Sequence, residues 1–178
     1  MIKIVGGKYR SRSIEVPQEG TVPTKARVRE AMLSMVCPYL EGARVLDLFA
    51  GSGALGIECL SRGASSCLFV DSSQEAANII RKNLESLGET KGTVLCQDYV
   101  SALSSQTEPF DVVFLDPPYA NKEAYNASLS LLLRRNLLTD QAMLLLEYEG
   151  EIPPLIEGYL PVKEKKYGYT KVVRLRKE

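Results

Sequence analysis

The chain has 178 residues, 45% of them hydrophobic, and its 22 Lys and Arg residues balance 22 Asp and Glu residues. This length fits a single domain, residues 1–178, with one core. No segment approaches the ~20 consecutive apolar residues of a membrane span, and the N-terminus lacks the apolar region of a signal peptide, so we predict a cytoplasmic protein. With four cysteines lacking CxxC spacing and no histidine, we predict free, mostly buried thiols and no metal.

The neutral total charge hides an uneven distribution. Residues 1–30 hold seven basic against three acidic side chains, residues 160–178 hold seven against two, and the middle of the chain is acidic. Scattered surface charge also clusters by chance, so this pattern alone does not establish a nucleic-acid partner.

The N-terminal part, residues 1–40, reads as an appendage to the domain. Residues 2–16 predict a small β-hairpin that turns at or just after Gly6-Gly7. A helix follows, with Thr24 as its N-cap. Its expected apolar face comprises Val28, Ala31, Met32, Met35 and Val36.

From Arg44 onward, short apolar runs alternate with helical patterns, which is typical of a parallel sheet built from βαβ units. The expected strands are 44–48, 66–70, 92–96, 110–115 and 142–148, followed by an antiparallel pair at 162–166 and 171–176 around Gly168. The expected helices are 53–62, 73–87 with Gly88 as its stop, and 123–136. The fold class is therefore α/β, with a seven-stranded, mostly parallel sheet.

A glycine-rich turn follows the first strand of this sheet and leads directly into a helix. It reads Asp47-Leu-Phe-Ala-Gly51-Ser-Gly53-Ala-Leu-Gly56 and fits the GxGxxG pattern of nucleotide sites. Asp71 ends the next strand, where a carboxylate can accept hydrogen bonds from ribose hydroxyls. An adenosine-containing cofactor is therefore expected here.

The residue before the glycines favours S-adenosylmethionine (SAM) over NAD. Asp47 would repel the phosphates of a dinucleotide but suits the ammonium and sulfonium groups of SAM. Asp98, after the third strand, is placed to reach the adenine amino group, and Phe49 to flank apolar parts of the ligand. Asp71 or Asp98, taken singly, could instead be a helix N-cap.

The tetrapeptide Asp116-Pro117-Pro118-Tyr119 ends the fourth strand and indicates the chemistry. The exocyclic amine of a nucleobase is a poor nucleophile because its lone pair is delocalised into the ring. Ionised Asp116 can accept one N–H and the Pro117 carbonyl a second, which directs the lone pair at a methyl donor. Both prolines hold these acceptors rigidly, and Tyr119 offers a stacking face for an extruded base. A rigid turn without function is the simpler alternative.

These residues resemble known motifs. Asp47–Gly56 is similar to motif I of class I SAM methyltransferases, and Asp116–Tyr119 to the DPPY motif of amino methyltransferases. Together with Ile4–Arg12, Pro23–Glu30 and Phe49–Glu58, nearly the whole chain resembles the bacterial 16S ribosomal RNA guanine-N2 methyltransferases of the RsmD type. One departure is Ala26, where family members often carry an acidic residue.

The resemblance implies a Rossmann-like fold with a final antiparallel strand and a guanine of 16S RNA as substrate. It implies SAM contacts at Asp47, Gly51, Gly53, Asp71 and Asp98, and the guanine amine against Asp116 and Tyr119. Ribosomal RNA, free or in a small-subunit particle, is then the expected partner of a monomer. Arg10, Arg12, Arg27 and Arg29 precede the sheet and are candidates to bind RNA phosphates.

Three alternatives stay open at this stage. An NAD-dependent oxidoreductase would share the glycine turn but lacks a proton donor, since there is no histidine and no Tyr-x-x-x-Lys on one helix face. An adenine-N6 methyltransferase acting on DNA or RNA would use Asp116 equally well. A non-catalytic RNA-binding factor would have no physical need of Asp47, Asp71 and Asp116 together.

Overall fold

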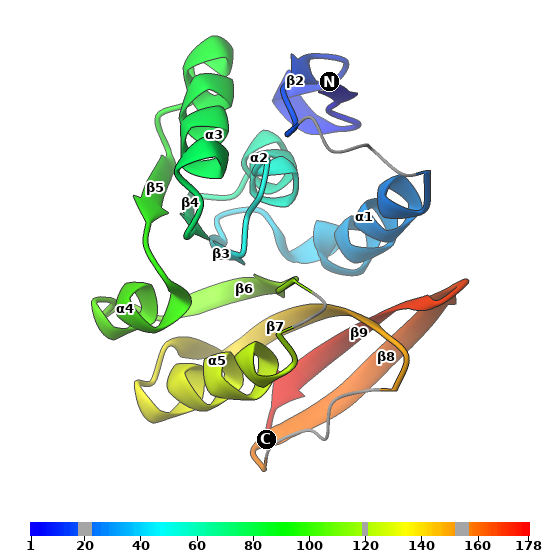
Figure 1. The fold of residues 1–178 in the computed structure, drawn as a ribbon, viewed down its shortest axis with the longest axis vertical. Coiled ribbons are helices and arrows are strands. Elements are labelled where there is room, and N and C mark those ends of the chain that lie inside the picture. The colour runs from blue at the N-terminus through cyan, green and yellow to red at the C-terminus, as the bar shows by residue number, and fades with distance from the viewer. Residues whose placement is uncertain (18–22, 119–120, 152–156) are drawn as a thin grey trace.

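The centre of the molecule is a seven-stranded sheet in the order β5-β4-β3-β6-β7-β9-β8 (Figure 1). In this computed structural model, residues 1–17, 23–118, 121–151 and 157–178 are described. The strands are β3 (Arg44–Leu48), β4 (Ser66–Asp71), β5 (Gly92–Cys96), β6 (Phe110–Leu115), β7 (Leu138–Glu149), β8 (Tyr159–Tyr167) and β9 (Thr170–Lys177). All neighbours from β5 to β7 pair in parallel, and β9 runs antiparallel to both β7 and β8. The predicted Rossmann-like sheet with an antiparallel last strand is confirmed.

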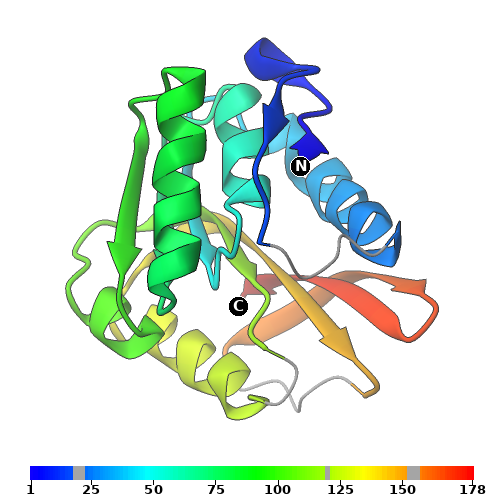
Figure 2. The same cartoon turned by 45° about the horizontal axis from the view of Figure 1, so that its top comes forward.

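Helices cover both faces of the sheet (Figures 1 and 2). On one face lie α1 (Pro23–Val36), α2 (Ala54–Ser61) and α3 (Gln74–Leu87), and on the other α4 (Tyr99–Ser104) and α5 (Glu123–Arg134). Strand residues alternate between the two layers: Val45 and Phe114 pack with the first group of helices, Leu46 and Val113 with the second. Burial on both sides explains why the central strands are almost wholly apolar.

The chain reverses its direction of winding at β3. Strand β3 pairs with β4 on one side and with β6 on the other. The connection after β3 therefore leads towards one side of the sheet, to β4, and the connection after β6 leads towards the other side, to β7. Ligands of open α/β sheets bind at such a point, outside the carboxyl ends of the strands. Both predicted motifs, the glycine turn and the Asp-Pro-Pro sequence, begin there.

The N-terminal hairpin consists of β1 (Ile2–Lys3) and β2 (Ser13–Ile14), with a 3-10 turn at Gly7–Tyr9 between them. Its apolar residues Ile4 and Ile14 are buried in the same core as α1 and α2. The predicted apolar face of α1 is buried along its whole length. A second 3-10 turn, Cys37–Tyr39, leads from α1 towards the sheet.

Several boundaries differ from the predictions. Helix α1 begins at Pro23, so Thr24 lies inside the helix and is not its N-cap. Strand β7 begins four residues before the predicted start. Its pairing with β6 is irregular there, since Phe110 pairs with Leu138 and Val112 with Met143, and the polar residues between Leu138 and Met143 are thereby included in the strand. Helix α5 ends at Arg134, two residues early, and α4 was not predicted at all.

The four cysteines are free, as predicted, but only Cys59 and Cys67 are buried, while Cys37 is exposed. Within the described ranges, no helix is long and apolar enough to cross a bilayer. Those same residues contain no group of three or more Cys, Asp or Glu side chains arranged to hold a metal ion.

Candidate functional site

The glycine turn connects β3 to α2 through an unusual backbone. Gly51 and Gly53 have φ angles of 57° and 76°, in the left-handed region that favours glycine, and Gly53 is the N-cap of α2. Phe49 also has a positive φ, 67°, which is strained for an aromatic residue. This conformation turns the chain sharply and brings Phe49 to the edge of two cavities.

The third glycine of the turn packs the helix against the sheet. A Cβ atom on Gly56 would lie 2.4 Å from Cε1 of Phe69 and 2.6 Å from Sγ of Cys67, so no larger residue fits. The amide of Gly56 donates a hydrogen bond to Oδ2 of Asp47 at 3.0 Å. The close packing of α2 against the sheet and the position of the Asp47 carboxylate therefore both depend on Gly56.

Asp47 is buried, with 3% of its surface exposed, and lines the first cavity. Burial raises the pKa of its carboxyl from 3.8 to about 7, against the opposing effect of the Gly56 N–H, and the charge of Asp71 adds to the rise. A carboxylate in this environment is stabilised by a positively charged ligand. The ammonium and sulfonium of SAM have that charge.

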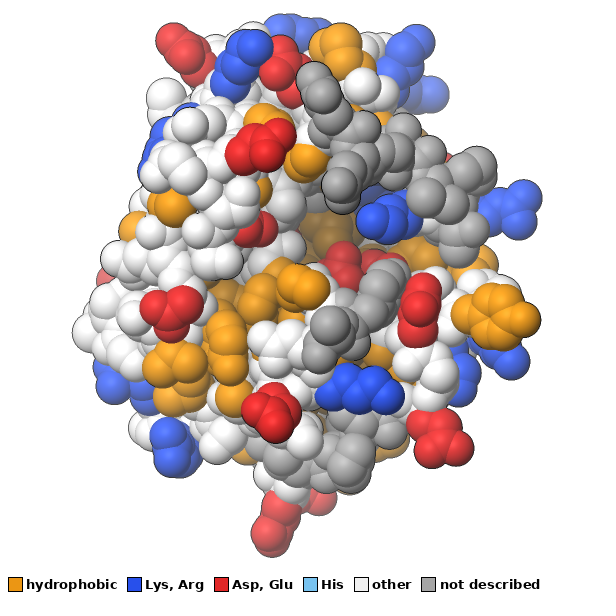
Figure 3. Space-filling model, in the orientation of Figure 1, with side chains coloured by type: hydrophobic (Ala, Val, Ile, Leu, Met, Phe, Trp, Pro, Cys, Tyr) orange, Lys and Arg blue, Asp and Glu red, His pale blue; other side chains and the backbone are white. Residues whose placement is uncertain are grey.

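Two cavities meet at this turn. The first is lined by the glycine turn, residues of the hairpin and α1, and the side chains of Asp47, Asp116 and Glu147. The second extends towards β4 and β5 and is lined by Asp71, Asp98 and Tyr99 among others. Lys25, Phe49 and Asp116 line both. In Figure 3 the surface is hollowed in this region, with acidic side chains in the hollow and a Lys or Arg side chain beside it.

In the second cavity, Asp71 accepts two backbone hydrogen bonds. Its Oδ2 accepts from the amide of Gly51 and its Oδ1 from that of Ser73, each at 2.9 Å. Asp71 thus holds the glycine turn, while Ser73 serves as the N-cap of α3. Asp71 is only partly buried, and its carboxylate keeps lone pairs that a ribose hydroxyl can use.

Asp98 is the N-cap of α4, which is the alternative role considered for it. Its carboxylate accepts hydrogen bonds from the hydroxyl and the amide of Ser101, and these lower its pKa. The side chain is exposed at the rim of the second cavity. Phe49 and Tyr99 line the same cavity, and the centroids of their rings lie 5.4 Å apart, so part of the cavity wall is apolar.

Together, these features fit an extended ligand with a cationic end and an adenosine end. The first cavity has the buried anion, and the second has a ribose-type acceptor, an aromatic edge and a carboxylate at its rim. Predicted residues Asp47, Phe49, Gly51, Asp71 and Asp98 all line one or both cavities. SAM has this distribution of charge and groups.

Asp116 follows the last residue of β6 and lies where the two cavities join. Burial raises the pKa of its carboxyl well above the usual range. The neighbouring carboxyl of Glu147 raises this pKa further, by its charge and by a hydrogen bond. The charge of Lys25 lowers it, and the charge of Asp47 raises it. Pro117 is buried and lines the second cavity with Pro118. Tyr119 lies outside the described residues.

Two residues of this site were missed from the sequence, Lys25 and Glu147. Lys25 is on α1 and lines both cavities. Glu147 is on β7, 7% exposed, in the position next to Asp116, because Leu115 pairs with Leu146 in the sheet. A glutamate within an otherwise apolar predicted strand was the available signal for Glu147.

The four arginines predicted to bind RNA differ in exposure. Arg10, Arg12 and Arg27 are exposed, and one Arg12 amino group donates to the carbonyl of Ser86 at 2.9 Å. Arg29 is partly buried and lines the first cavity. The structure therefore brings Arg29 to the carboxylates of the site and leaves the other three on the surface.

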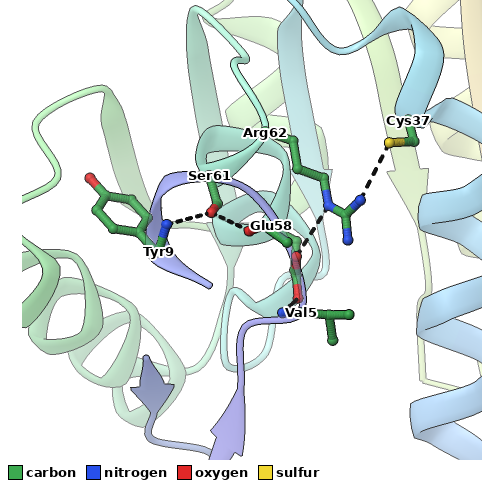
Figure 4. Close-up of polar contacts among 7 residues, drawn as sticks. Val5, Tyr9, Cys37, Glu58, Ser61 and Arg62 are labelled. Carbon is green, nitrogen blue, oxygen red and sulfur yellow. Dashed lines mark hydrogen bonds and ion pairs between the residues drawn. The ribbon is translucent and has the colours of Figure 1, made fainter. Parts of the chain in front are cut away.

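A buried carboxylate anchors the hairpin to α2 (Figure 4). Glu58, 2% exposed, accepts a hydrogen bond from the amide of Val5 at 2.6 Å and forms an ion pair with Arg62. Ser61 accepts from the amide of Tyr9 and donates to the carbonyl of Gly6. Since Ile2, Val16 and Pro17 line the first cavity, this anchor also fixes part of the cavity wall.

A sheet of this order with a glycine turn after β3 and an Asp-Pro-Pro sequence after β6 defines a Rossmann-like methyltransferase. Solved structures share this fold: one described as "Putative methyltransferase yhhF from Escherichia coli" superposes with a TM-score of 0.90 at 31% identity, covering 99% of this chain and 98% of that one. A structure described as "putative methylase HI0767 from Haemophilus influenzae" superposes with a TM-score of 0.83 at 34% identity, over 99% and 98% of the two chains.

The family follows from sequence comparison. The family model described as "Conserved hypothetical protein 95" matches residues 2–176, and the chain belongs to this family, that of the RsmD-type methyltransferases. A curated relative from Haemophilus influenzae, named ribosomal RNA small subunit methyltransferase D, is 38% identical over 94% of this chain and 89% of its own length. The Escherichia coli protein of the same name is 35% identical over 84% and 76%.

Proposed function

We propose that this protein transfers a methyl group from SAM to the exocyclic N2 amine of a guanine in small-subunit ribosomal RNA. The observation that carries the proposal is the position of Asp116, whose partly buried carboxyl lines both cavities, beside the residues expected to bind SAM. The names of the relatives support ribosomal RNA as the substrate.

SAM, when bound, supplies an electrophilic methyl group. The chain's own residues orient the acceptor: ionised Asp116 accepts one N–H of the amine, and the carbonyl of Pro117 accepts the other. This arrangement localises the nitrogen lone pair, and the two prolines keep the acceptors from rotating away. After transfer, Asp116 can accept the proton that the methylated amine must lose.

The experiment is methyl transfer from tritium-labelled SAM to small-subunit RNA, free or in particles, from cells that lack this protein. Mass mapping of the product then identifies the nucleotide. Asp116→Asn should lower the rate of transfer by about 10²–10³-fold or more, whereas Asp140→Asn, which changes an exposed carboxylate paired with Lys177, should retain it. If the label is found on the N6 of an adenine, the substrate is adenine and not guanine. If the wild-type protein transfers no label, the proposal is refuted.

We further propose that Arg10, Arg12, Arg27 and Arg29 form the RNA-facing side of the site. The guanidinium groups of Arg10, Arg12 and Arg27 are exposed and can neutralise phosphates, whose contacts give RNA affinity its salt dependence. Arg27→Glu should weaken RNA binding and flatten the salt dependence while SAM affinity is unchanged. Arg134→Glu on the exposed end of α5 is the matched control, and equal effects of the two changes would refute the assignment.

A further inference from the structure

Two carboxylic side chains lie side by side at the reacting end of the site. Asp116 and Glu147 occupy neighbouring positions on the parallel strands β6 and β7 and face the same cavity. A hydrogen bond between the two carboxyl groups is one of the causes that raise the pKa of Asp116. The buried hydroxyl of Tyr125 donates to the backbone carbonyl of Glu147, which fixes this point of the strand.

Helix α1 provides two cations to the same cavity. Lys25 and Arg29 both line it, and the charge of Lys25 favours the ionised form of Asp116. The Nε of Arg29 is buried and has no hydrogen-bond partner among the described residues. Two enclosed carboxylates repel each other, so both are ionised only when nearby groups compensate their charge. The two cations supply part of this compensation, and N–H groups of a ligand that donate hydrogen bonds to the carboxylates can supply the rest.

Adjacent ionised carboxylates present acceptors only, so they select a ligand edge that has adjacent donors. Guanine has such an edge, since its N1–H lies beside its N2 amine. Adenine presents a lone pair at N1 beside its N6 amine, which two carboxylates would repel. Enzymes that act on an extruded base read this edge through hydrogen bonds.

We propose that Glu147 is a specificity-determining residue that accepts the N1–H of the target guanine while Asp116 accepts an N–H of its 2-amine. Any proton that the two carboxyls bind before the base enters is released to solvent when the N–H donors of the base take its place. This inference rests on the proposed methyl transfer at Asp116 and adds the reason why the acceptor is guanine.

The test uses the full-length protein and small-subunit RNA in which the mapped target guanosine is replaced by 2,6-diaminopurine riboside. This base keeps the 2-amine but has a lone pair in place of the N1–H. Glu147→Gln keeps the shape of the side chain and adds an amide N–H that can donate to that lone pair. Glu149→Gln, two residues later on β7 and exposed, is the matched control.

The measured quantity is the ratio of kcat/KM for guanosine RNA to that for diaminopurine RNA. The wild-type protein and the Glu149→Gln variant should prefer guanosine by about 100-fold or more, as expected when a site is built to accept from an N–H. Glu147→Gln should reduce this preference by at least about tenfold, the effect of weakening one charged hydrogen bond. With S-adenosylhomocysteine present, Glu147→Gln should also reduce the preference in binding affinity for guanosine RNA over diaminopurine RNA. The affinity for SAM should be unaltered.

Failure of this inference differs from failure of the proposed function. If the wild-type protein methylates guanosine RNA and Glu147→Gln keeps the wild-type ratio, Glu147 does not read the base, and methyl transfer at Asp116 stands. If the wild-type protein accepts diaminopurine as well as guanosine, the inference is also overturned. If it methylates neither RNA, both proposals fall.

Discussion

Asp47 makes the stability of the ligand-free protein depend on pH in an unusual direction. Its carboxyl has a pKa of about 7 in the folded chain, compared with 3.8 for an exposed aspartate, chiefly because it is buried. Since the folded state binds the proton more tightly than the unfolded state, stability is retained at low pH and is lost as the pH rises from about 4 to about 7. A difference of about three pH units corresponds to about 4 kcal/mol.

Asp47→Asn removes this effect with little change of shape. The amide oxygen can still accept the hydrogen bond from Gly56, and no charge is buried at any pH. At pH 8 without SAM, the variant should be more stable than the wild-type protein by up to about 4 kcal/mol, or roughly 8–16 °C in Tm for a chain of this size. At pH 4 the two proteins should differ by less than about 1 kcal/mol.

Urea unfolding at pH 4 and pH 8 measures the two differences, and calorimetric titration measures SAM affinity. The variant should bind SAM more weakly at pH 8, because its cavity lacks the anion that offsets the ligand's positive charge. Asp140→Asn serves as the control, since that carboxylate is 94% exposed and its replacement should give no pH-dependent gain. A variant at position 47 that is no more stable than wild type at pH 8 would refute this reasoning.

Other predictions concern the reacting carboxyl and the packing of the turn. Asp116→Asn should lower kcat by about 10²–10³-fold or more, measured by tritium transfer, with SAM affinity nearly unchanged. Because the pKa of Asp116 is raised, kcat/KM should still increase with pH above the range in which an ordinary aspartate titrates. Glu147→Gln removes the neighbouring carboxyl and should move this increase to lower pH. A pH profile that does not move would contradict the coupling of the two carboxyls. Gly56→Ala, whose added methyl would meet the Phe69 ring, should cost about 1–3 kcal/mol in chemical unfolding, and an unchanged midpoint would show that the helix can shift freely.

The sequence alone predicted the sheet well, because its strands are nearly continuous apolar runs between clear helix signals. The predicted helix 73–87 was given Gly88 as its stop, and in the structure Gly88 is the C-cap of α3, while Ser73 is its N-cap. The six-residue α4 was missed because so short a segment has too few turns for a periodic pattern. The early start of β7 was missed because Thr139, Asp140 and Gln141 are polar and enter the sheet only through an irregular pairing.

The candidate site was predicted where one local segment supplies the chemistry. The glycine turn and Asp116 lie in such segments, whereas Glu147 becomes part of the site only because β7 pairs with β6 at that register. Lys25 reaches both cavities because α1 packs across the sheet, through long-range contacts that no local pattern specifies. The left-handed backbone of Phe49 could not be anticipated either, since an aromatic residue does not favour it.

The anchoring of the hairpin has a consequence for the order in which the chain folds. The amides of Val5 and Tyr9 bond to side chains 53 and 52 residues further along the chain, and the amide of Glu15 to Asn83, 68 residues away. An isolated two-stranded ribbon is at best marginally stable in water. The hairpin leaves the ribosome before α2 and α3 but becomes ordered only after them, because these two helices are the surfaces on which it docks.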